Sequence, residues 1–442
     1  MAEAQTIFAL SSAPGRAGIA VVRVSGPAAG AVVDILAPPR PVNRIAALRR
    51  IRDPQSSEII DEALVLWFAA PRTETGEDMV ELHLHGSPAV VKAVLATLGR
   101  QPGCRLAEPG EFARRAFNNG KLDLAQVEGL ADLIDAETEA QRHQALAQMR
   151  GALSDLYEGW RRDLLEASAL VEAAIDFSDE GDVAGDAFER ARGIVATLHA
   201  AIAAHLADGN RGEILREGFR VVLAGPPNSG KSSLLNALAR REAAIVSEEA
   251  GTTRDVIEVR LDLDGLPVIV SDTAGIREPL GAIEKEGIRR TLAHAREADL
   301  VLWLSDASEP PVAPPPDVSA RGGKCFLTLA SKIDIPGASA AGMLAISSKT
   351  GAGLPELIQR VAGLARERIG DLHAPAITHA RQRNSLQVCL RALQDFITLP
   401  ASEQELRAED LRIAVHALGR ITGRVDVEDV LGEIFGRFCI GK

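Results

Sequence analysis

The stretch GPPNSGKS at residues 225–232 determines the fold of the middle of the chain. It matches the pattern GxxxxGK[ST], with FRVVLA before it, which is typical of a strand, and SSLLNALA after it, which is typical of a helix. The glycines allow a tight loop whose backbone N–H groups converge on phosphate oxygens at the positive end of the helix. Lys231 adds a charge at the β- and γ-phosphates, and the Ser232 hydroxyl is predicted to bind Mg²⁺. The alternative is a glycine-rich strand-to-helix turn without a ligand, and the strand and helix patterns on either side disfavour it.

Two later segments fit the same phosphate site. The run VIVS leads into Asp272-Thr273-Ala274-Gly275, and GTTRD at 251–255 lies between this tetrapeptide and the loop. An acidic residue at a strand end can hold the Mg²⁺ shell, and the Gly275 N–H can contact the γ-phosphate. Thr253 is predicted to complete the Mg²⁺ coordination.

The segment that selects the base is Ser331-Lys332-Ile333-Asp334, which resembles the NKxD pattern of GTPases with serine in place of asparagine. Asp334 is expected to accept hydrogen bonds from the guanine N1 and N2 donors. The segment ISSK at 346–349 resembles the loop that backs the base. The sequence therefore predicts GTP rather than ATP as the nucleotide.

Apolar patterning divides the chain into parts of different kinds. Residues 6–100 carry strand patterns (TIFALSS, GIAVVRVSG, EALVLWFA, MVELHLHG) and one helix that starts at Pro88 and ends at Gly99. They predict an α+β domain that ends near residue 118. Residues 122–177, 187–207 and 376–436 show helical spacing of apolar residues.

The middle section, about 218–370, alternates strands and helices, as in a mostly parallel, doubly wound sheet. The simplest architecture is an α/β domain inserted into a discontinuous helical domain. The expected domains are 1–118 (N-terminal), 119–216 (helical, first part), 217–372 (GTPase) and 373–442 (helical, second part).

Composition narrows the functional classes. The 442 residues include 46% apolar and 25% charged residues, and the net charge of −12 argues against non-specific nucleic-acid binding by the whole surface. No run is long and apolar enough to span a bilayer, and the N-terminus lacks a signal-peptide pattern, so we expect a cytoplasmic location. The cysteines form no CxxC pair, and Cys439 receives no role.

Several segments carry a family resemblance. They are PGRAGIAVVRVSG (14–26), TGEDMVELHLHG (75–86), PGEFARRAFNNGKLDLAQVEGLADLIDA (109–136), AAIDFSDE (173–180) and FCIGK (438–442). Together with the loop at 225–232, they make the chain resemble the MnmE/TrmE family of potassium-dependent GTPases, which modify the tRNA wobble uridine. The resemblance spans essentially the whole chain.

The resemblance implies roles for individual residues. It implies a homodimer through the N-terminal domains, K⁺ binding by Asn228, Ser247, Glu249 and Thr252, and Glu284 as the catalytic residue that positions water, since Ile276 stands where other GTPases hold glutamine. A tetrahydrofolate one-carbon donor would contact Arg23, Glu81, Lys121 and Lys442. His83 and His85 lack a third ligand for a metal. The motifs and the resemblance together predict GTP contacts from Asn228, Ser229, Gly230, Lys231, Ser232, Ser233, Ser247, Thr252, Thr253, Asp272, Thr273, Ala274, Gly275, Lys332, Asp334, Ser347, Ser348 and Lys349.

The implied function joins GTP hydrolysis to tRNA modification. With a flavin-dependent partner (MnmG/GidA), in a heterotetramer or larger complex, the dimer would add a carboxymethylaminomethyl or aminomethyl group to C5 of the wobble uridine. Two alternatives remain: a GTPase switch that modifies nothing, for example in ribosome assembly, and a scaffold with a degenerate GTPase domain. The intact Lys231, Ser232, Thr253 and Asp272 disfavour the scaffold, and the folate-type N-terminus disfavours the switch.

Overall fold

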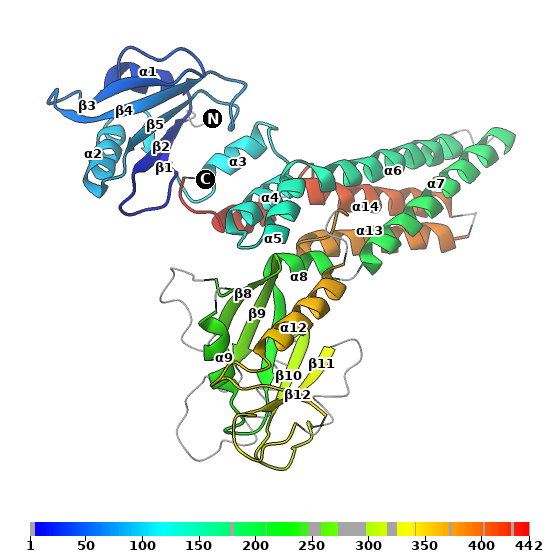
Figure 1. The fold of residues 1–442 in the computed structure, drawn as a ribbon. Coiled ribbons are helices and arrows are strands. Elements are labelled where there is room, and N and C mark those ends of the chain that lie inside the picture. The colour runs from blue at the N-terminus through cyan, green and yellow to red at the C-terminus, as the bar shows by residue number, and fades with distance from the viewer. Residues whose placement is uncertain are drawn as a thin grey trace, which may run out of the picture. The chain divides into compact units, whose positions relative to one another are not determined.

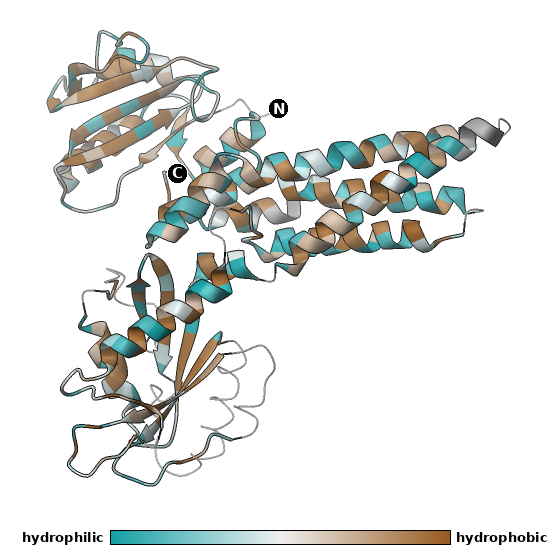
Figure 2. Ribbon diagram, turned by 45° about the vertical axis from the view of Figure 1, so that its right-hand side comes forward, coloured by the Kyte–Doolittle hydropathy of each residue, from teal (hydrophilic) through white to brown (hydrophobic). Residues whose placement is uncertain are grey.

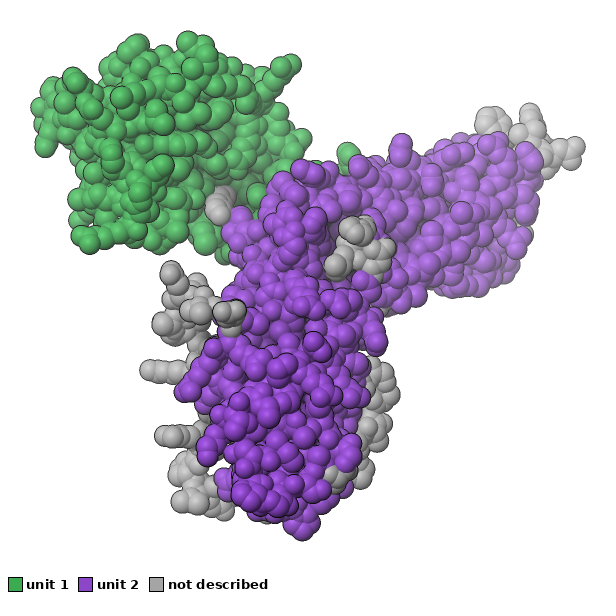
Figure 3. All heavy atoms as spheres, viewed as in Figure 1, with its two compact units in different colours: residues 1–131, 418–442 green, residues 132–417 purple. Residues whose placement is uncertain are grey.

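The chain forms two compact units, shown in Figure 3. Unit 1 comprises residues 1–131 and 418–442, and unit 2 comprises residues 132–417. The computed structural model describes residues 5–176, 181–208, 210–241, 243–245, 258–272, 298–315, 325–340, 342–370, 374–400, 403–425 and 428–441. The boundaries of the four domains expected from the sequence stay a prediction.

Unit 1 contains a six-stranded sheet in the order β3-β4-β5-β2-β1-β6, visible in Figure 1. Neighbouring strands are antiparallel, except for β1 and β6, which are parallel. The strands are β1 Thr6–Leu10, β2 Ile19–Ser25, β3 Ala47–Arg52, β4 Ile59–Phe68, β5 Met79–His85 and β6 Cys104–Leu106.

Two helices cover one face of this sheet because its strands alternate in polarity. In β5, Val80, Leu82 and Leu84 are buried, whereas the intervening Glu81 and His83 are only partly buried. The buried side chains belong to a core with α1, Ala29–Leu36, and α2, Pro88–Gly99. The α2 helix begins at the predicted Pro88, where a missing N–H costs no hydrogen bond.

Unit 1 also includes the C-terminal end of the chain. Phe435 and Phe438 pack with residues of α3, Glu111–Asn118, and of the first turns of α4, Leu124–Asp135. Helix α15, Glu428–Gly436, carries the first of these phenylalanines. Beyond it, the Ser11 hydroxyl donates to the Gly441 carbonyl oxygen at 2.9 Å. Gly441 therefore contacts the segment that follows strand β1.

The helices of unit 2 that lie outside its α/β part come from both sides of that part in the sequence. They are α5 Glu139–Met149, α6 Ala152–Asp176, α7 Gly181–Ala207, α13 Ala380–Thr398 and α14 Gln404–Thr422, of which α14 ends within unit 1. Phe188 of α7 stacks on Phe396 of α13 with ring centroids 5.9 Å apart. Helices that flank the α/β part in sequence thus pack together in space (Figure 1).

The second sheet has the order β12-β11-β10-β7-β9-β8. As the sequence predicts, neighbouring strands of this sheet are mostly parallel. Among its described strands, only the pair β8 and β9 is antiparallel. The strands are β7 Phe219–Ala224, β8 Glu258–Leu263, β9 Leu266–Asp272, β10 Leu300–Asp306, β11 Cys325–Ser331 and β12 Leu344–Ala345.

The central strands of this sheet are apolar along most of their length, as their brown colour in Figure 2 shows. Val221 and Leu223 of β7 pack with α9, Lys231–Ala239, and α12, Leu354–Ile369, whereas Val222 joins a smaller cluster with Trp303. The short α8, Arg211–Glu217, leads directly into β7. This arrangement buries β7 on both faces and puts the loop at 225–232 at its end.

Within the described part of the chain, we find no helix with the length and apolar character that a bilayer crossing requires.

Candidate nucleotide-binding site

The loop at 225–232 connects β7 to α9 as predicted and depends on two glycines. Gly225 has φ +144°, and a Cβ atom there would lie 2.3 Å from the Leu304 carbonyl oxygen, so no larger residue fits. Gly230 has φ +92° and is the N-cap of α9. Because α9 begins at the next residue, its free N–H groups and its positive end lie at the loop.

Lys231 lies against the loop that precedes it. Its side chain is largely buried, and Nζ donates to the carbonyl oxygens of Gly225 at 2.9 Å and Pro226 at 2.8 Å. Burial lowers the pKa of the Lys231 ammonium, and the Asp272 carboxylate acts in the opposite direction. The ammonium is thus held at the loop, where it could attract the phosphate oxygens of a nucleotide.

Ser232 and Asp272 come together at this end of the sheet. The Ser232 hydroxyl donates to Asp272 Oδ2 at 2.6 Å, and Asp272 is buried at the last position of β9. A hydroxyl and a carboxylate side by side are hard oxygen ligands of the kind that Mg²⁺ prefers. Ser233, also predicted to contact the nucleotide, is exposed in the first turn of α9.

The predicted base-binding residues are brought together by two loops. The exposed Asp334 accepts a hydrogen bond from the Ser347 hydroxyl at 2.6 Å, and Ser347 is fully buried. That hydrogen bond, together with the charge of Lys349, lowers the pKa of Asp334. Ser348 lies between Ser347 and Lys349 in the same loop. The carboxylate therefore stays ionised and can accept from the N–H groups of guanine.

Asp306 is a residue of this site that the sequence reasoning missed. It ends β10, and its Oδ2 lies 2.6 Å from the Nζ of Lys332. Partial burial acts to raise the pKa of Asp306, but hydrogen bonds from Lys332 and Ser308 outweigh it and lower the pKa to about 2. Its position after the run LVLWLS repeats the pattern of Asp272 after VIVS, and that repetition was the available signal.

Ser331 contacts the phosphate-binding loop. Its Oγ lies 2.6 Å from the carbonyl oxygen of Ser229 and 3.1 Å from that of Ser305. The sequence showed only that serine stands where the NKxD pattern has asparagine. The contact joins the base-binding segment to the loop that precedes α9.

Asn228 is described, but most of the other predicted K⁺ and switch residues are not. Asn228 is exposed and has φ +60°, a left-handed backbone that asparagine adopts more readily than most residues. This conformation alone accounts for an asparagine in the loop, so its K⁺ role stays a prediction. The following predicted residues lie outside the described part of the chain: Ser247, Glu249, Thr252, Thr253, Thr273, Ala274, Gly275, Glu284 and Lys442.

Three of the four residues predicted to bind folate lie around one loop of unit 1. Arg23 in β2 donates to Glu81 in β5 at 3.1 Å and pairs with Glu74 at 2.7 Å. A Cβ atom at Gly76 in the same loop would lie 3.1 Å from Cε of Lys121. A guanidinium, a carboxylate and an ammonium thus lie close to the loop at 74–76, a set that suits a ligand with amino and carboxylate groups.

The two histidines of β5 bind different carboxylates. His83 Nε2 lies 3.2 Å from Glu81 Oε2, and His85 Nδ1 lies 2.7 Å from Asp61 Oδ1. Glu81 is therefore shared by His83 and Arg23. Across the ranges that the structure describes, no group of three or more His, Cys, Asp or Glu residues is arranged to hold a metal ion.

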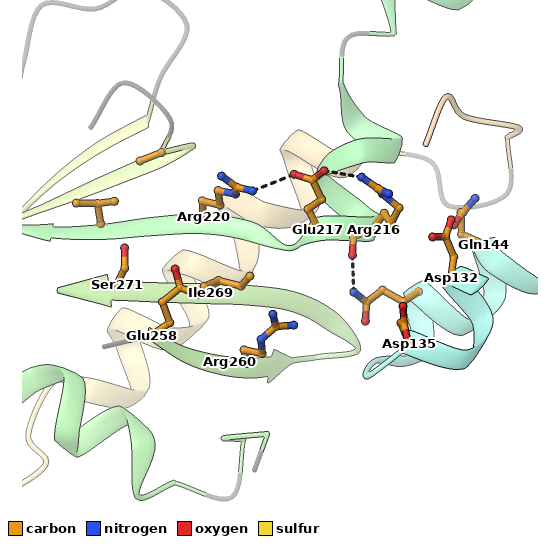
Figure 4. Close-up of a pocket in the computed structure, with 13 residues that line it drawn as sticks. Asp132, Asp135, Gln144, Arg216, Glu217, Arg220, Glu258, Arg260, Ile269 and Ser271 are labelled. Atoms are coloured by element: carbon orange, nitrogen blue, oxygen red, sulfur yellow. Dashed lines mark hydrogen bonds and ion pairs between the residues drawn. The ribbon is translucent and has the colours of Figure 1, made fainter. Parts of the chain in front are cut away.

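A separate polar cavity of about 490 Å³ lies beside the beginning of β7 and is shown in Figure 4. In it, Glu217 accepts from Arg216 at 2.5 Å and from Arg220 at 3.0 Å. Of the predicted nucleotide-binding residues that the structure describes, none lines this cavity. The loop at 225–232 follows the end of β7, so the cavity is distinct from the nucleotide site.

Comparisons with known proteins cover the whole chain. Residues 6–121 match the family model described as the GTP-binding protein TrmE N-terminus, and residues 124–439 match the MnmE helical domain. The protein named tRNA modification GTPase MnmE from Methylobacterium sp. (strain 4-46) is 54% identical over 448 residues, which are 99% of this chain and 99% of that protein. The protein of the same name from Parvibaculum lavamentivorans is 52% identical over 447 residues, which are 99% and 100% of the two chains.

Among solved structures, the crystal structure of Aquifex aeolicus Era Y63A bound to GDP·AlF4⁻ matches part of each chain. The TM-score is 0.27 and the identity 25%, over 39% of this chain and 66% of that one. The full-length relatives and the two family models agree with each other. The chain belongs to the MnmE family of tRNA modification GTPases and is a GTP hydrolase.

Proposed function

We propose that this chain is a K⁺-dependent GTPase that works with a flavin-dependent partner protein (MnmG/GidA) in a heterotetramer or larger complex. The two proteins would add a carboxymethylaminomethyl or aminomethyl group to C5 of the tRNA wobble uridine. A tetrahydrofolate derivative would supply the one-carbon unit, and the chain would act as a cytoplasmic homodimer. Its membership in a family of tRNA modification GTPases supports the substrate class.

The observation that carries the GTPase part is the contact between the Ser232 hydroxyl and Asp272 beside the Lys231 ammonium. Mg²⁺, when bound there with GTP, would neutralise charge that develops on the phosphate oxygens. Ser232 would hold it directly, with Thr253 as the second protein ligand and Asp272 in its shell. Lys231 would move from the loop carbonyls to the β- and γ-phosphates.

Base selection is assigned to the carboxylate of Asp334. Ser347 donates to one of its oxygens, and the lowered pKa keeps it charged, so it can accept the two N–H donors of guanine. Adenine offers no matching pair of donors at this edge. The proposed order of affinity is therefore GTP and GDP above ATP and ADP.

The water that attacks GTP would be positioned by Glu284. K⁺ would be held by Asn228, Ser247, Glu249 and Thr252, and would add positive charge between the β- and γ-phosphates. These assignments rest on the family resemblance, since only Asn228 of the five lies within the described ranges.

The folate site is proposed around Arg23, Glu81, Lys121 and Lys442. A carboxylate can accept from the amino group of a pterin, and cations suit the carboxylates of a glutamate tail. The contacts of Arg23 with Glu81 and Glu74 support this proposal because they hold a donor and an acceptor at the same sheet face.

Analysis of the wobble uridine in tRNA from cells that lack this protein tests the modification. The proposal expects the modified uridine to disappear and to return when the intact gene is restored, but not when the restored gene carries Lys231→Ala. Unaltered tRNA in cells that lack the protein would reject the modification function. It would not reject GTP hydrolysis, and it would favour the alternative of a GTPase switch that modifies nothing.

A GTPase assay in K⁺ and in Na⁺ tests the ion. We expect hydrolysis to be faster in K⁺ than in Na⁺, because a cation held between the β- and γ-phosphates stabilises the charge of the transition state as an arginine finger does. Glu284→Ala should retain GTP affinity and lose most of its turnover. Equal rates in the two salts would reject the K⁺ assignment, and full turnover of the variant would reject Glu284 as the catalytic residue.

A further inference from the structure

Ser331 lies where the two halves of the nucleotide site meet. It is the last residue of β11 and is only 3% exposed. Its hydroxyl reaches the Ser229 carbonyl oxygen of the phosphate-binding loop at 2.6 Å, across 102 positions of sequence. A buried hydrogen bond of this length fixes the separation between the end of β11 and the phosphate-binding loop.

The hydroxyl proton can serve only one of its two neighbouring acceptors. The Ser305 carbonyl oxygen is 3.1 Å away, and the Ser229 carbonyl oxygen is closer by enough to be the preferred acceptor. Ser331 is itself held from β10, because the Ala307 N–H donates to its carbonyl oxygen at 2.9 Å. Ser331 is therefore fixed at the end of the sheet, and its hydroxyl positions the phosphate-binding loop.

The hydrogen bond from Ser331 also orients the peptide group between Ser229 and Gly230, whose N–H can face the nucleotide phosphates. In a trans peptide the C=O and N–H bonds point in opposite directions. A carbonyl held by Ser331 therefore turns the N–H of Gly230 away from Ser331. Gly230 packs directly on this side chain, because a Cβ atom at position 230 would lie 3.8 Å from both Cβ and Oγ of Ser331.

We propose that Ser331 is a positioning residue that sets the direction of the Gly230 N–H for the nucleotide phosphates. Its hydrogen bond to Ser229 also couples the phosphate-binding loop to the base-binding segment, where the next residue, Lys332, pairs with Asp306. Ser331 acts through the backbone and does not read the base. This inference rests on the proposed placement of the guanine nucleotide at the loop.

Calorimetry with GDP and inosine diphosphate, which lacks the 2-amino group, tests this role in the full chain. Ser331→Ala removes the donor, so GDP affinity should fall about tenfold, the effect of one hydrogen bond. The affinity for inosine diphosphate should fall by the same factor, because the contact of Asp334 with the base is unchanged. Ser331→Asn, which restores an N–H donor, should bind GDP within about threefold of the unmodified protein.

Ser154→Ala is the matched control, since Ser154 is a buried serine of α6 that has no role in the nucleotide site. It should bind GDP as the unmodified protein does. GDP affinity of Ser331→Ala within about twofold of the unmodified protein would overturn the proposal. A changed ratio of GDP to inosine diphosphate affinity would also overturn it, because Ser331 would then act on the base. Absence of GDP binding by the unmodified protein would reject the nucleotide site itself.

Discussion

Lys332 and Asp306 show how a charged pair is formed from the ends of neighbouring strands. Lys332 follows β11 with φ +59°, and its ammonium lies 2.6 Å from the carboxylate that ends β10. Ser308 donates from both its N–H, at 2.9 Å, and its hydroxyl, at 2.7 Å, to the other oxygen of Asp306. The carboxylate thus has a partner at each oxygen and keeps the lysine close to the base-binding segment.

The lowered pKa of Asp306 gives a prediction for acid stability. Because its pKa falls from 3.8 to about 2 on folding, the ionised carboxylate stabilises the native state at all pH values above about 4. This contribution is lost as the pH falls through about 2. Asp306→Asn should therefore lower the free energy of unfolding at neutral pH by about 1 kcal/mol or less, because Lys332 remains accessible to solvent.

Urea unfolding of both proteins over a series of pH values measures that difference. The gap in unfolding free energy between the unmodified protein and Asp306→Asn should narrow as the pH falls from 3.8 toward 2. A gap that stays constant over this range would contradict the assigned pair.

Among single residues, the sequence predicted those whose roles follow from local motifs. Lys231, Ser232 and Asp272 lie together as their motifs require. Asp306 could not be predicted as the partner of Lys332, because their contact depends on the parallel register in which Asp306 faces Ser331. The hydrogen bond from Ser331 to Ser229 could not be predicted from the sequence for the same reason.

The start of helix α5 is fixed by a capping box that also contacts the α/β part of unit 2. The Gln141 side-chain oxygen accepts from the N–H groups of Glu137 at 3.0 Å and Thr138 at 3.1 Å. Its Nε2 donates to the Arg216 carbonyl oxygen at 2.9 Å, and the Ala140 N–H donates to the Gly265 carbonyl oxygen at 3.1 Å. One amide side chain therefore satisfies groups of both α5 and α8.

Replacement of this side chain should be costly. We expect Gln141→Ala to lower the free energy of unfolding by about 2 kcal/mol, since one buried and two partly buried backbone groups lose their partner. The exposed Arg142, next in the sequence, provides the control. Arg142→Ala should change the free energy of unfolding by no more than about 0.5 kcal/mol. Chemical denaturation measures both, and equal effects of the two substitutions would contradict the role assigned to Gln141.

The elements predicted from the sequence are those whose patterns are local. Helix α2 has the predicted ends, and β7, β9 and β10 match the apolar runs FRVVLA, VIVS and LVLWL to within two residues at each end. Strand β3 was not predicted, because its sequence ALRRIR forms an exposed edge whose arginines resemble an ordinary polar surface. The contact of Phe435 and Phe438 with α3 and α4 joins distant segments, and no local pattern indicates it.

At the scale of the whole molecule, the nucleotide site lies in unit 2, whereas the proposed folate site lies in unit 1. The contacts described above for each site join residues of the same unit. GTP binding and folate binding can therefore be tested one at a time in the same full-length protein. If this chain binds tRNA as proposed, a net charge of −12 requires a local surface for it, since the molecule as a whole repels polyanions.

The most direct test is a calorimetric titration of the full chain with GDP in the presence of Mg²⁺, repeated with ADP. We predict one GDP site per chain, lost in Lys231→Ala, and an affinity for ADP at least about 100-fold weaker, because Asp334 pairs with donors that adenine lacks. No detectable heat with GDP, or equal affinity for GDP and ADP, would contradict the account.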